Sequence, residues 1–107
     1  MAYKLRFVQK FQQSKTEEFM QLEKMFMELE QKVEGFPKGK RYVSYMGGLP
    51  VSTLIWECEF PTLEELIMAK KLIENDNVHD DLFEKQVQYI IESYVEIYKE
   101  IDLTPNK

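Results

Sequence analysis

The stretch "TLIWECEFPTLEEL", residues 53–66, places a strand-like run directly before a proline and an acidic helix start. Successive side chains of a strand point to opposite faces of a sheet. Trp56 and Cys58 then lie on one face. Glu57 and Glu59 lie on the other. These four side chains therefore do not act together as one site within a subunit.

The end of this stretch has the form of a capping box. In "TLEE", Thr62 is followed three residues later by Glu65, a spacing that satisfies free backbone N–H groups at a helix start. The pattern predicts a strand over 51–60 and a helix over 63–74, which stops at the polar "ENDN".

Upstream, the sequence alternates from residue 3 to residue 11, which predicts a strand with one buried face. Ser14 and Glu17 repeat the capping-box spacing, and an apolar stripe at helical intervals follows, so we expect a helix over 15–34. A tyrosine- and valine-rich run over 40–46 leads into the turn signal "GGLP". It forms a hairpin with the strand over 51–60.

Downstream, helical spacing predicts a third helix over 78–92, and a period of two returns from Tyr94 as a fourth strand. Strand, helix, strand, strand, helices, strand is the order of a split βαβ arrangement. The predicted fold class is α+β, with a four-stranded antiparallel sheet and helices on one face. We expect one domain over 1–103 and a flexible C-terminal tail over 104–107.

The composition excludes several classes of function. A chain of 107 residues with a net charge of −5 disfavours binding to nucleic acid, and no apolar run is long enough to cross a membrane, so we expect a cytoplasmic protein. The single cysteine and single histidine offer no metal-ligand spacing, so no metal site is expected. The cations of "PKGKR", residues 37–41, are typical of a solvated turn, with anion binding as the alternative.

The face of the sheet without helices is expected to be an interface. We expect β-branched residues of the last strand to be exposed on this face, and the candidates are Val95, Ile97 and Ile101. Contiguous apolar surface of this kind usually marks an interface. A twofold homodimer that packs sheet on sheet would bury it. The alternative is that Glu57, Glu59, Lys99 and neighbouring cations solvate the face.

The order of elements, together with "TLIWECEFPTLEEL", resembles the dimeric α/β-barrel superfamily of ferredoxin-like domains. It is most similar to small bacterial proteins of the NIPSNAP and antibiotic-biosynthesis-monooxygenase (ABM) kind. The resemblance covers nearly the whole chain as an arrangement of elements, and its sequence motif is short. One fold hosts many functions, so it bears on the fold more than on the activity.

The resemblance also implies candidate functional residues. Several oxygenase families of the superfamily carry a histidine after the second helix, where this chain has His79. A further histidine often precedes it, and this chain has Lys70 and Lys71 in that region instead. Haem-degrading members use an asparagine on the first strand, where this chain has Gln9. The resemblance implies cofactor-independent chemistry, with haem as an alternative cofactor.

Trp56 is a candidate wall of a ligand pocket because its indole can stack on a flat aromatic molecule. Four tyrosines are candidate hydrogen-bond donors around such a ligand: Tyr42, Tyr45, Tyr94 and Tyr98. A tryptophan in the middle of a strand can equally fill the core. The sequence leaves both interpretations of Trp56 open.

His79 is the weak candidate for catalysis, as a base or as an axial ligand to haem iron. The alternative is a solvated histidine in the first turn of an acidic helix. Cys58 is expected to be a buried, inert thiol rather than a nucleophile, because the glutamates beside it disfavour thiolate. Glu57 and Glu59 are a further candidate for a general acid.

Two functions follow. In the first, a small homodimer binds an apolar or aromatic metabolite between sheet and helices, and oxidises or isomerises it in the manner of a monooxygenase or an isomerase. In the second, the core is filled and the domain is a non-catalytic dimeric module for binding or assembly. The sequence names no substrate.

Overall fold

A computed structural model describes residues 2–105 of the chain. Its elements in order are β1 (Tyr3–Phe11), a 3₁₀ turn η1 (Gln13–Lys15), α1 (Thr16–Lys32), β2 (Lys40–Val43), β3 (Thr53–Phe60), α2 (Leu63–Asn75), α3 (Asn77–Gln86), a 3₁₀ turn η2 (Val87–Tyr89) and β4 (Ile90–Lys99). The strands form one antiparallel sheet in the order β2-β3-β1-β4. The predicted α+β fold class, with its four-stranded antiparallel sheet, is confirmed.

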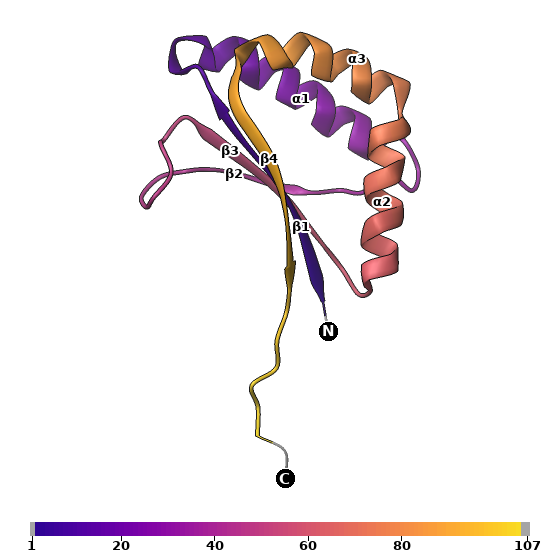
Figure 1. Ribbon diagram of the computed structural model, residues 1–107. Coiled ribbons are helices and arrows are strands. Elements are labelled where there is room, and N and C mark those ends of the chain that lie inside the picture. Colours follow the sequence, from indigo (N-terminus) through magenta and orange to yellow (C-terminus); the bar gives the residue numbers. More distant parts are fainter. Residues whose placement is uncertain (1, 106–107) are drawn as a thin grey trace.

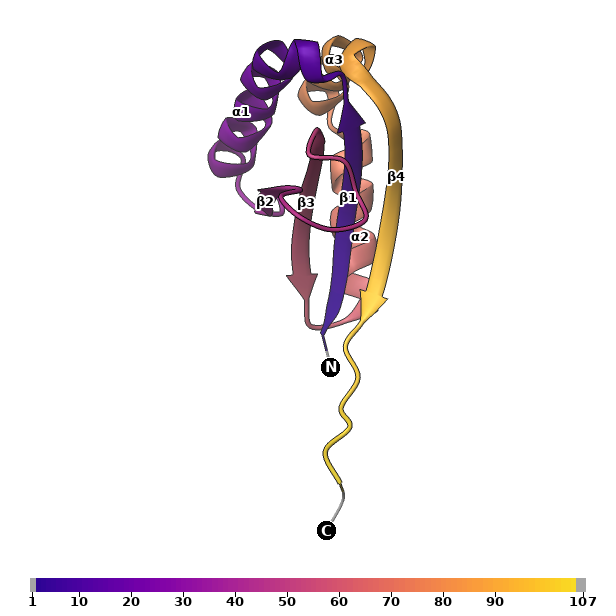
Figure 2. The same cartoon turned by 90° about the vertical axis from the view of Figure 1, so that its left-hand side faces the viewer.

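The helices lie on one side of the sheet (Figure 1). The view in Figure 2 looks onto the other side, with β3, β1 and β4 in front of α2. We call this helix-free side the open face. Beyond β4 the chain runs away from the sheet as an extended segment (Figure 1). Residues 106–107 of the expected tail lie outside the described residues.

Strand pairing fixes the two faces. Phe7 lies opposite Trp56 in β3 and Val95 in β4, so all three side chains lie on the helix side. Arg6 lies opposite Glu57, so both lie on the open face. The predicted division of the "WECE" residues between the two faces is therefore confirmed.

The start of α2 confirms its capping residue, because Thr62 Oγ1 accepts a 3.1 Å hydrogen bond from the Glu65 backbone N–H. The capping box expected at Ser14 is wrong. Ser14 lies within η1, and α1 begins after Lys15 with no capping side chain.

The predicted third helix is too long. Its last residues had helical spacing, but Ile90 pairs with Phe11 and begins β4. A β-branched pair, Ile90 and Ile91, suits a strand better than a helix, and the free edge of β1 offers the hydrogen bonds. The helix over 78–92 is therefore α3 and η2 followed by the first part of β4.

The apolar interior consists of two clusters between the sheet and the helices. One contains Phe11, Phe19 and Leu54 under the start of α1, where the Phe11 and Phe19 rings stack at 4.4 Å between centroids. The other contains Leu5, Leu29, Phe36, Trp56, Leu66 and Ile73. Phe26 of α1 is buried outside both clusters and faces a cavity.

Candidate functional site

The cavity lies between the helices and the inner face of the sheet and has a volume of about 320 Å³. Its walls are mainly apolar: Phe7, Phe26, Phe36, Trp56, Ile73, Phe83 and Val95. Among the polar groups that also line it are Gln9, Ser93, Gln86, His79 and three charged residues from α1 and β2. The core beside Trp56 is therefore not filled.

Trp56 both packs in the core and lines the cavity. It is 6% exposed, and its ring stacks on Phe7 with 5.1 Å between centroids. The indole N–H donates a 3.3 Å hydrogen bond to Glu30 Oε1, which satisfies its only polar group. The backbone at Gly39 lies against the same edge of the ring, next to Nε1, Cε2 and Cζ2. These contacts hold the indole rigidly at the cavity wall.

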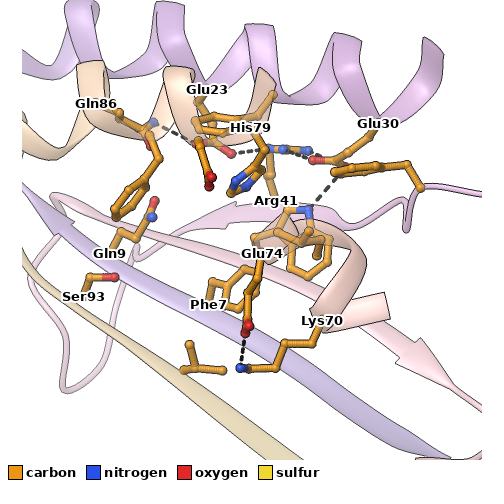
Figure 3. Close-up of a pocket in the computed structure, with 17 residues that line it drawn as sticks. Phe7, Gln9, Glu23, Glu30, Arg41, Lys70, Glu74, His79, Gln86 and Ser93 are labelled. Atoms are coloured by element: carbon orange, nitrogen blue, oxygen red, sulfur yellow. Dashed lines mark hydrogen bonds and ion pairs between the residues drawn. The ribbon is translucent and has the colours of Figure 1, made fainter. Parts of the chain in front are cut away.

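A buried ion-pair network lies beside Trp56. Arg41 of β2 reaches between Glu23 and Glu30 of α1, and its guanidinium donates hydrogen bonds to both carboxylates. Gln86 of α3 donates from Nε2 to Glu23 Oε1 at 2.9 Å. The network thus joins α1, α3 and the sheet across one side of the cavity (Figure 3).

Burial by itself would lower the pKa of Arg41, but the hydrogen bonds and charges of Glu30 and Glu23 together raise it above its usual value. Arg41 therefore stays charged at every pH at which the protein folds. It lies on the inner face because it pairs with Trp56 across β2 and β3. The expectation that all the cations of "PKGKR" form a solvated turn is wrong for Arg41.

Glu23 and Glu30 are not among the residues predicted from the sequence, although the sequence contains a signal for them. Both fall on the same helical stripe as Phe19 and Phe26, at steps of three or four residues. A carboxylate on a buried stripe requires a partner, and two of them seven residues apart indicate a shared cation.

His79 lies at the cavity rather than on the solvated surface of its helix. Asp76 caps α3 by accepting a 2.8 Å hydrogen bond from the His79 backbone N–H. The imidazole packs against Phe26, with 4.8 Å between ring centroids, and lies 6.4 Å from the centroid of Phe36. Among the described residues its ring nitrogens have no hydrogen-bond partner. Because His79 lines the cavity, these nitrogens are available to a ligand.

Burial is the main influence on His79 and lowers its pKa below the ordinary value near 6.5. The charges of Asp80, Asp76, Glu23 and Glu30 oppose this shift without overcoming it. The imidazole is consequently neutral at pH 7, which is the form that accepts a proton.

The pH dependence of stability should reflect this neutral histidine. Between the lowered pKa of the folded state and the higher pKa of the unfolded state, the unfolded chain binds more protons, so the free energy of unfolding falls as pH falls through that window. We expect the only histidine signal in a proton NMR titration to have its midpoint below 6.5. In urea unfolding, His79→Gln should lose less stability than the wild type between pH 7 and pH 5. A midpoint above 6.5 would contradict the placement of the ring.

The four tyrosines do not line the cavity with Trp56. Tyr94 and Tyr98 lie on the open face because they pair with Val8 and Lys4 of β1. Tyr42 lies there too, opposite Ile55. Tyr45 is in the β2–β3 loop and is 89% exposed. Their selection as pocket donors is corrected, because strand register decides which face a residue occupies.

The other candidate reactive groups, Glu57, Glu59 and Cys58, do not form a site with the cavity. Glu57 pairs with Lys4 and Arg6 on the open face, so no buried carboxylate pair forms there. Burial raises the pKa of Cys58, with Glu30 and Glu59 adding to the effect, and its Sγ–H donates to the Lys38 carbonyl at 3.5 Å. The thiol is therefore protonated at neutral pH. No cluster of three metal-ligating side chains occurs within residues 2–105.

Comparisons with solved structures identify the fold. A NIPSNAP family protein from Agrobacterium tumefaciens matches with a TM-score of 0.76 and 15% identity, over the full length of both chains. An uncharacterised NIPSNAP domain protein from Burkholderia xenovorans matches with a TM-score of 0.74 and 9% identity, over 99% of this chain and 100% of the other.

A protein from Nitrosomonas europaea, provisionally described as an antibiotic biosynthesis monooxygenase, has a TM-score of 0.68 and 14% identity over 97% of this chain and 94% of its own. No family model matches the chain, and no curated protein matches its sequence. The ferredoxin-like fold of NIPSNAP- and ABM-like proteins is therefore shown. None of the helices in residues 2–105 is long and apolar enough to cross a membrane.

Proposed function

We propose that the protein binds a small, flat and largely apolar molecule in the cavity beside Trp56, and that His79 exchanges a proton with it. The observation that carries this proposal is one wall that combines aromatic rings with an accessible imidazole around about 320 Å³. That volume falls within the range of small-molecule sites. A molecule of two fused rings fits such a space.

His79 is the group best suited to chemistry in this cavity. A neutral imidazole acts as a general base toward an acidic C–H or O–H of a bound ligand. Arg41 is unsuited to bind an anionic intermediate, because Glu23 and Glu30 already balance its charge and accept a hydrogen bond from each of its three nitrogens. A proton transfer that isomerises the ligand, or prepares it for oxidation, is the reaction that these residues support.

Haem does not fit the residues around His79. The two propionates of haem require cations, whereas Arg41 is held by two glutamates and Lys70 pairs with Glu74. The buried carboxylates would repel the propionates. We therefore assign no step to haem.

A binding role without chemistry is the second candidate, and one observation favours it. His79 has no partner among the described residues that would orient its imidazole. If the protein only binds its ligand, neither the wild type nor His79→Gln transforms the ligand, and both bind it equally well. If His79 transfers a proton, the wild type transforms the ligand, whereas His79→Gln binds it without turnover.

Ligand binding can be followed through Trp56, because the chain has one tryptophan and thus one indole N–H signal in a ¹⁵N-correlated NMR spectrum. We expect 2-naphthylmethanol to shift this signal in a saturable titration. Val95→Phe, which fills part of the cavity, should weaken binding about tenfold or more, a change of about 1.4 kcal/mol.

Ile97→Phe is the matched control. Ile97 lies two residues along the same face of β4 and is as exposed as Val95, at 48%, but it does not line the cavity. The Ile97→Phe variant should bind the probe as tightly as the wild type does. An indole signal that stays fixed in the wild type at millimolar probe would rule out the proposed function.

We also propose that two copies pack through the open face. Val95 and Ile97, expected there from the sequence, lie instead on the helix side, where β4 leaves them half exposed. At the centre of the open face Val8 is only 1% exposed, so the apolar surface there comes from its partly exposed neighbours Ile55 and Tyr94 and from Tyr42, which is 48% exposed. Ion pairs flank this centre: Lys4–Glu57, Arg6–Glu57, Arg6–Glu96 and Lys10–Glu92. An apolar centre with paired charges around it suits a twofold interface.

Sedimentation should therefore give twice the chain mass of 12.9 kDa at micromolar concentration. Tyr42→Glu adds a charge to the open face beside Ile55 and should shift the protein toward the monomer. Ile67→Glu, on the exposed side of α2, should leave the dimer intact. A monomeric wild type would refute the interface.

A further inference from the structure

The charges around the cavity do not balance. Glu23 and Glu30 are 7% and 6% exposed, and Arg41 is the cation between them. One negative charge therefore remains uncompensated at the buried end. At the outer side Lys70 is paired with Glu74, and Asp80 adds a further carboxylate.

The two buried carboxylates differ in how fully their oxygens are used. Glu30 accepts hydrogen bonds from Gly39 N, from Trp56 Nε1 and from both terminal nitrogens of Arg41. Glu23 accepts one from Arg41 Nε and one from Gln86 Nε2. A carboxylate has about four acceptor positions. Glu23 thus has remaining capacity for donors, and it lines the cavity.

Gln86 adds an independent observation. Its side chain is fully buried, and its Nε2 donates to Glu23 Oε1 at 2.9 Å and to the Phe19 carbonyl at 3.4 Å. These two acceptors fix the orientation of the amide. Its Oε1 has no hydrogen-bond partner among the described residues. Figure 3 shows the Gln86 amide beside Glu23, on the helix side of the cavity across from Gln9.

An unpaired buried acceptor is costly. Gln86 Oε1 has less than 1 Å² of accessible surface, so a ligand that carries N–H or O–H groups satisfies it once the Gln86 side chain shifts toward the cavity that it lines. A carboxylate ligand offers no donor and would meet the uncompensated charge of Glu23 and Glu30. A cationic ligand would complete the charge balance and supply donors to Glu23. Every polar feature of this end of the cavity favours the same ligand chemistry.

We infer that the cavity selects aromatic molecules that carry an amine or another cationic N–H donor group, and discriminates against carboxylates of the same shape. This inference rests on the proposed function, since it requires that the cavity binds a ligand. It adds the substrate class: an aromatic body against Trp56 and Phe7, with the donor group directed at Glu23 and Gln86.

Three naphthalene probes of closely similar shape test the inference: 2-naphthylmethylammonium, 2-naphthylmethanol and 2-naphthoate. Each is titrated at pH 7.5 and 0.3 M salt, which screens attraction to the charged surface, and binding is followed by the Trp56 indole N–H signal. The ammonium probe should bind at least tenfold more tightly than the carboxylate, with the alcohol between them.

Glu23→Gln removes the uncompensated charge with little change of shape and should reduce the ratio of the two affinities about tenfold. Glu92→Gln is the matched control, because Glu92 pairs with Lys10 on the open face, remote from the cavity. It should leave the ratio unchanged. The wild-type comparison needs no variant, so it remains decisive if Glu23→Gln does not fold.

The outcomes separate the two proposals. If the alcohol binds but the three affinities are equal, or the carboxylate binds most tightly, the charge preference is wrong and the proposed function stands. If none of the probes shifts the indole signal, both proposals fail. A preference for the ammonium probe that is lost in Glu92→Gln and kept in Glu23→Gln would place the effect on the open face and overturn the inference.

Discussion

Arg41→Met should lower the free energy of unfolding by about 3–5 kcal/mol, the cost of leaving a buried charge without its partner. Methionine keeps the unbranched apolar part of the side chain, so most of the loss comes from the charge and its hydrogen bonds. In the variant, Glu23 and Glu30 lie side by side in the interior without a cation. Since small domains are stable by about 5–15 kcal/mol, the variant should be close to unfolding at room temperature.

Arg6→Met is the matched control. Arg6 also contacts two carboxylates, Glu57 and Glu96, but it lies on the open face and is about a third exposed. Solvent screens such pairs, and the expected loss is about 1 kcal/mol or less. Urea unfolding followed by far-UV circular dichroism gives both values. Equal losses for the two variants would show that the network at Arg41 is not buried as described.

A triple variant separates charge from packing. Arg41→Met combined with Glu23→Gln and Glu30→Gln removes all three charges and keeps the shapes close to native. Networks replaced in full are often as stable as the original. The triple variant should therefore be more stable than Arg41→Met alone. It should also lose the preference for the cationic probe.

The parts of the fold that the sequence predicted are those that local chemistry decides. The first strand, residues 3–11, has the predicted bounds because its alternation extends from Tyr3 to Phe11 and is broken only at Val8 and Gln9. The helix after Pro61 starts where Thr62 can cap it, and that contact involves only four residues. The third helix was predicted too long because Ile90 obeys helical spacing, while its pairing with Phe11 is a contact between distant parts of the chain.

The candidate site was predicted less well for the same reason. His79 was selected from its chemistry, but its neighbours Phe26 and Phe36 come from another helix and a loop. Arg41 belongs to a locally polar segment, and only its register against Trp56 directs it inward. Periodicity within one segment says which residues share a face. It does not say which face meets the helices.

Gly39→Ala should also destabilise the protein strongly. A Cβ atom at residue 39 would lie 2.0 to 2.6 Å from three atoms of the Trp56 indole, closer than non-bonded atoms approach. The indole cannot move away from this atom, because Phe7 stacks on the ring and the indole N–H donates a hydrogen bond to Glu30. Gly39 itself donates its backbone N–H to the same carboxylate at 3.2 Å, so moving the loop would disturb the network.

We expect Gly39→Ala to lower the free energy of unfolding by about 2–3 kcal/mol, at the upper end of the range for overpacking. Gly48→Ala is the control, since a Cβ there meets no atom within 4 Å and its backbone has no positive φ. The Trp56 indole N–H signal should move in the first variant and stay in the second. If Gly39→Ala is as stable as Gly48→Ala, the loop does not lie on the indole. That result would also contradict the rigid cavity wall that positions a ligand beside His79.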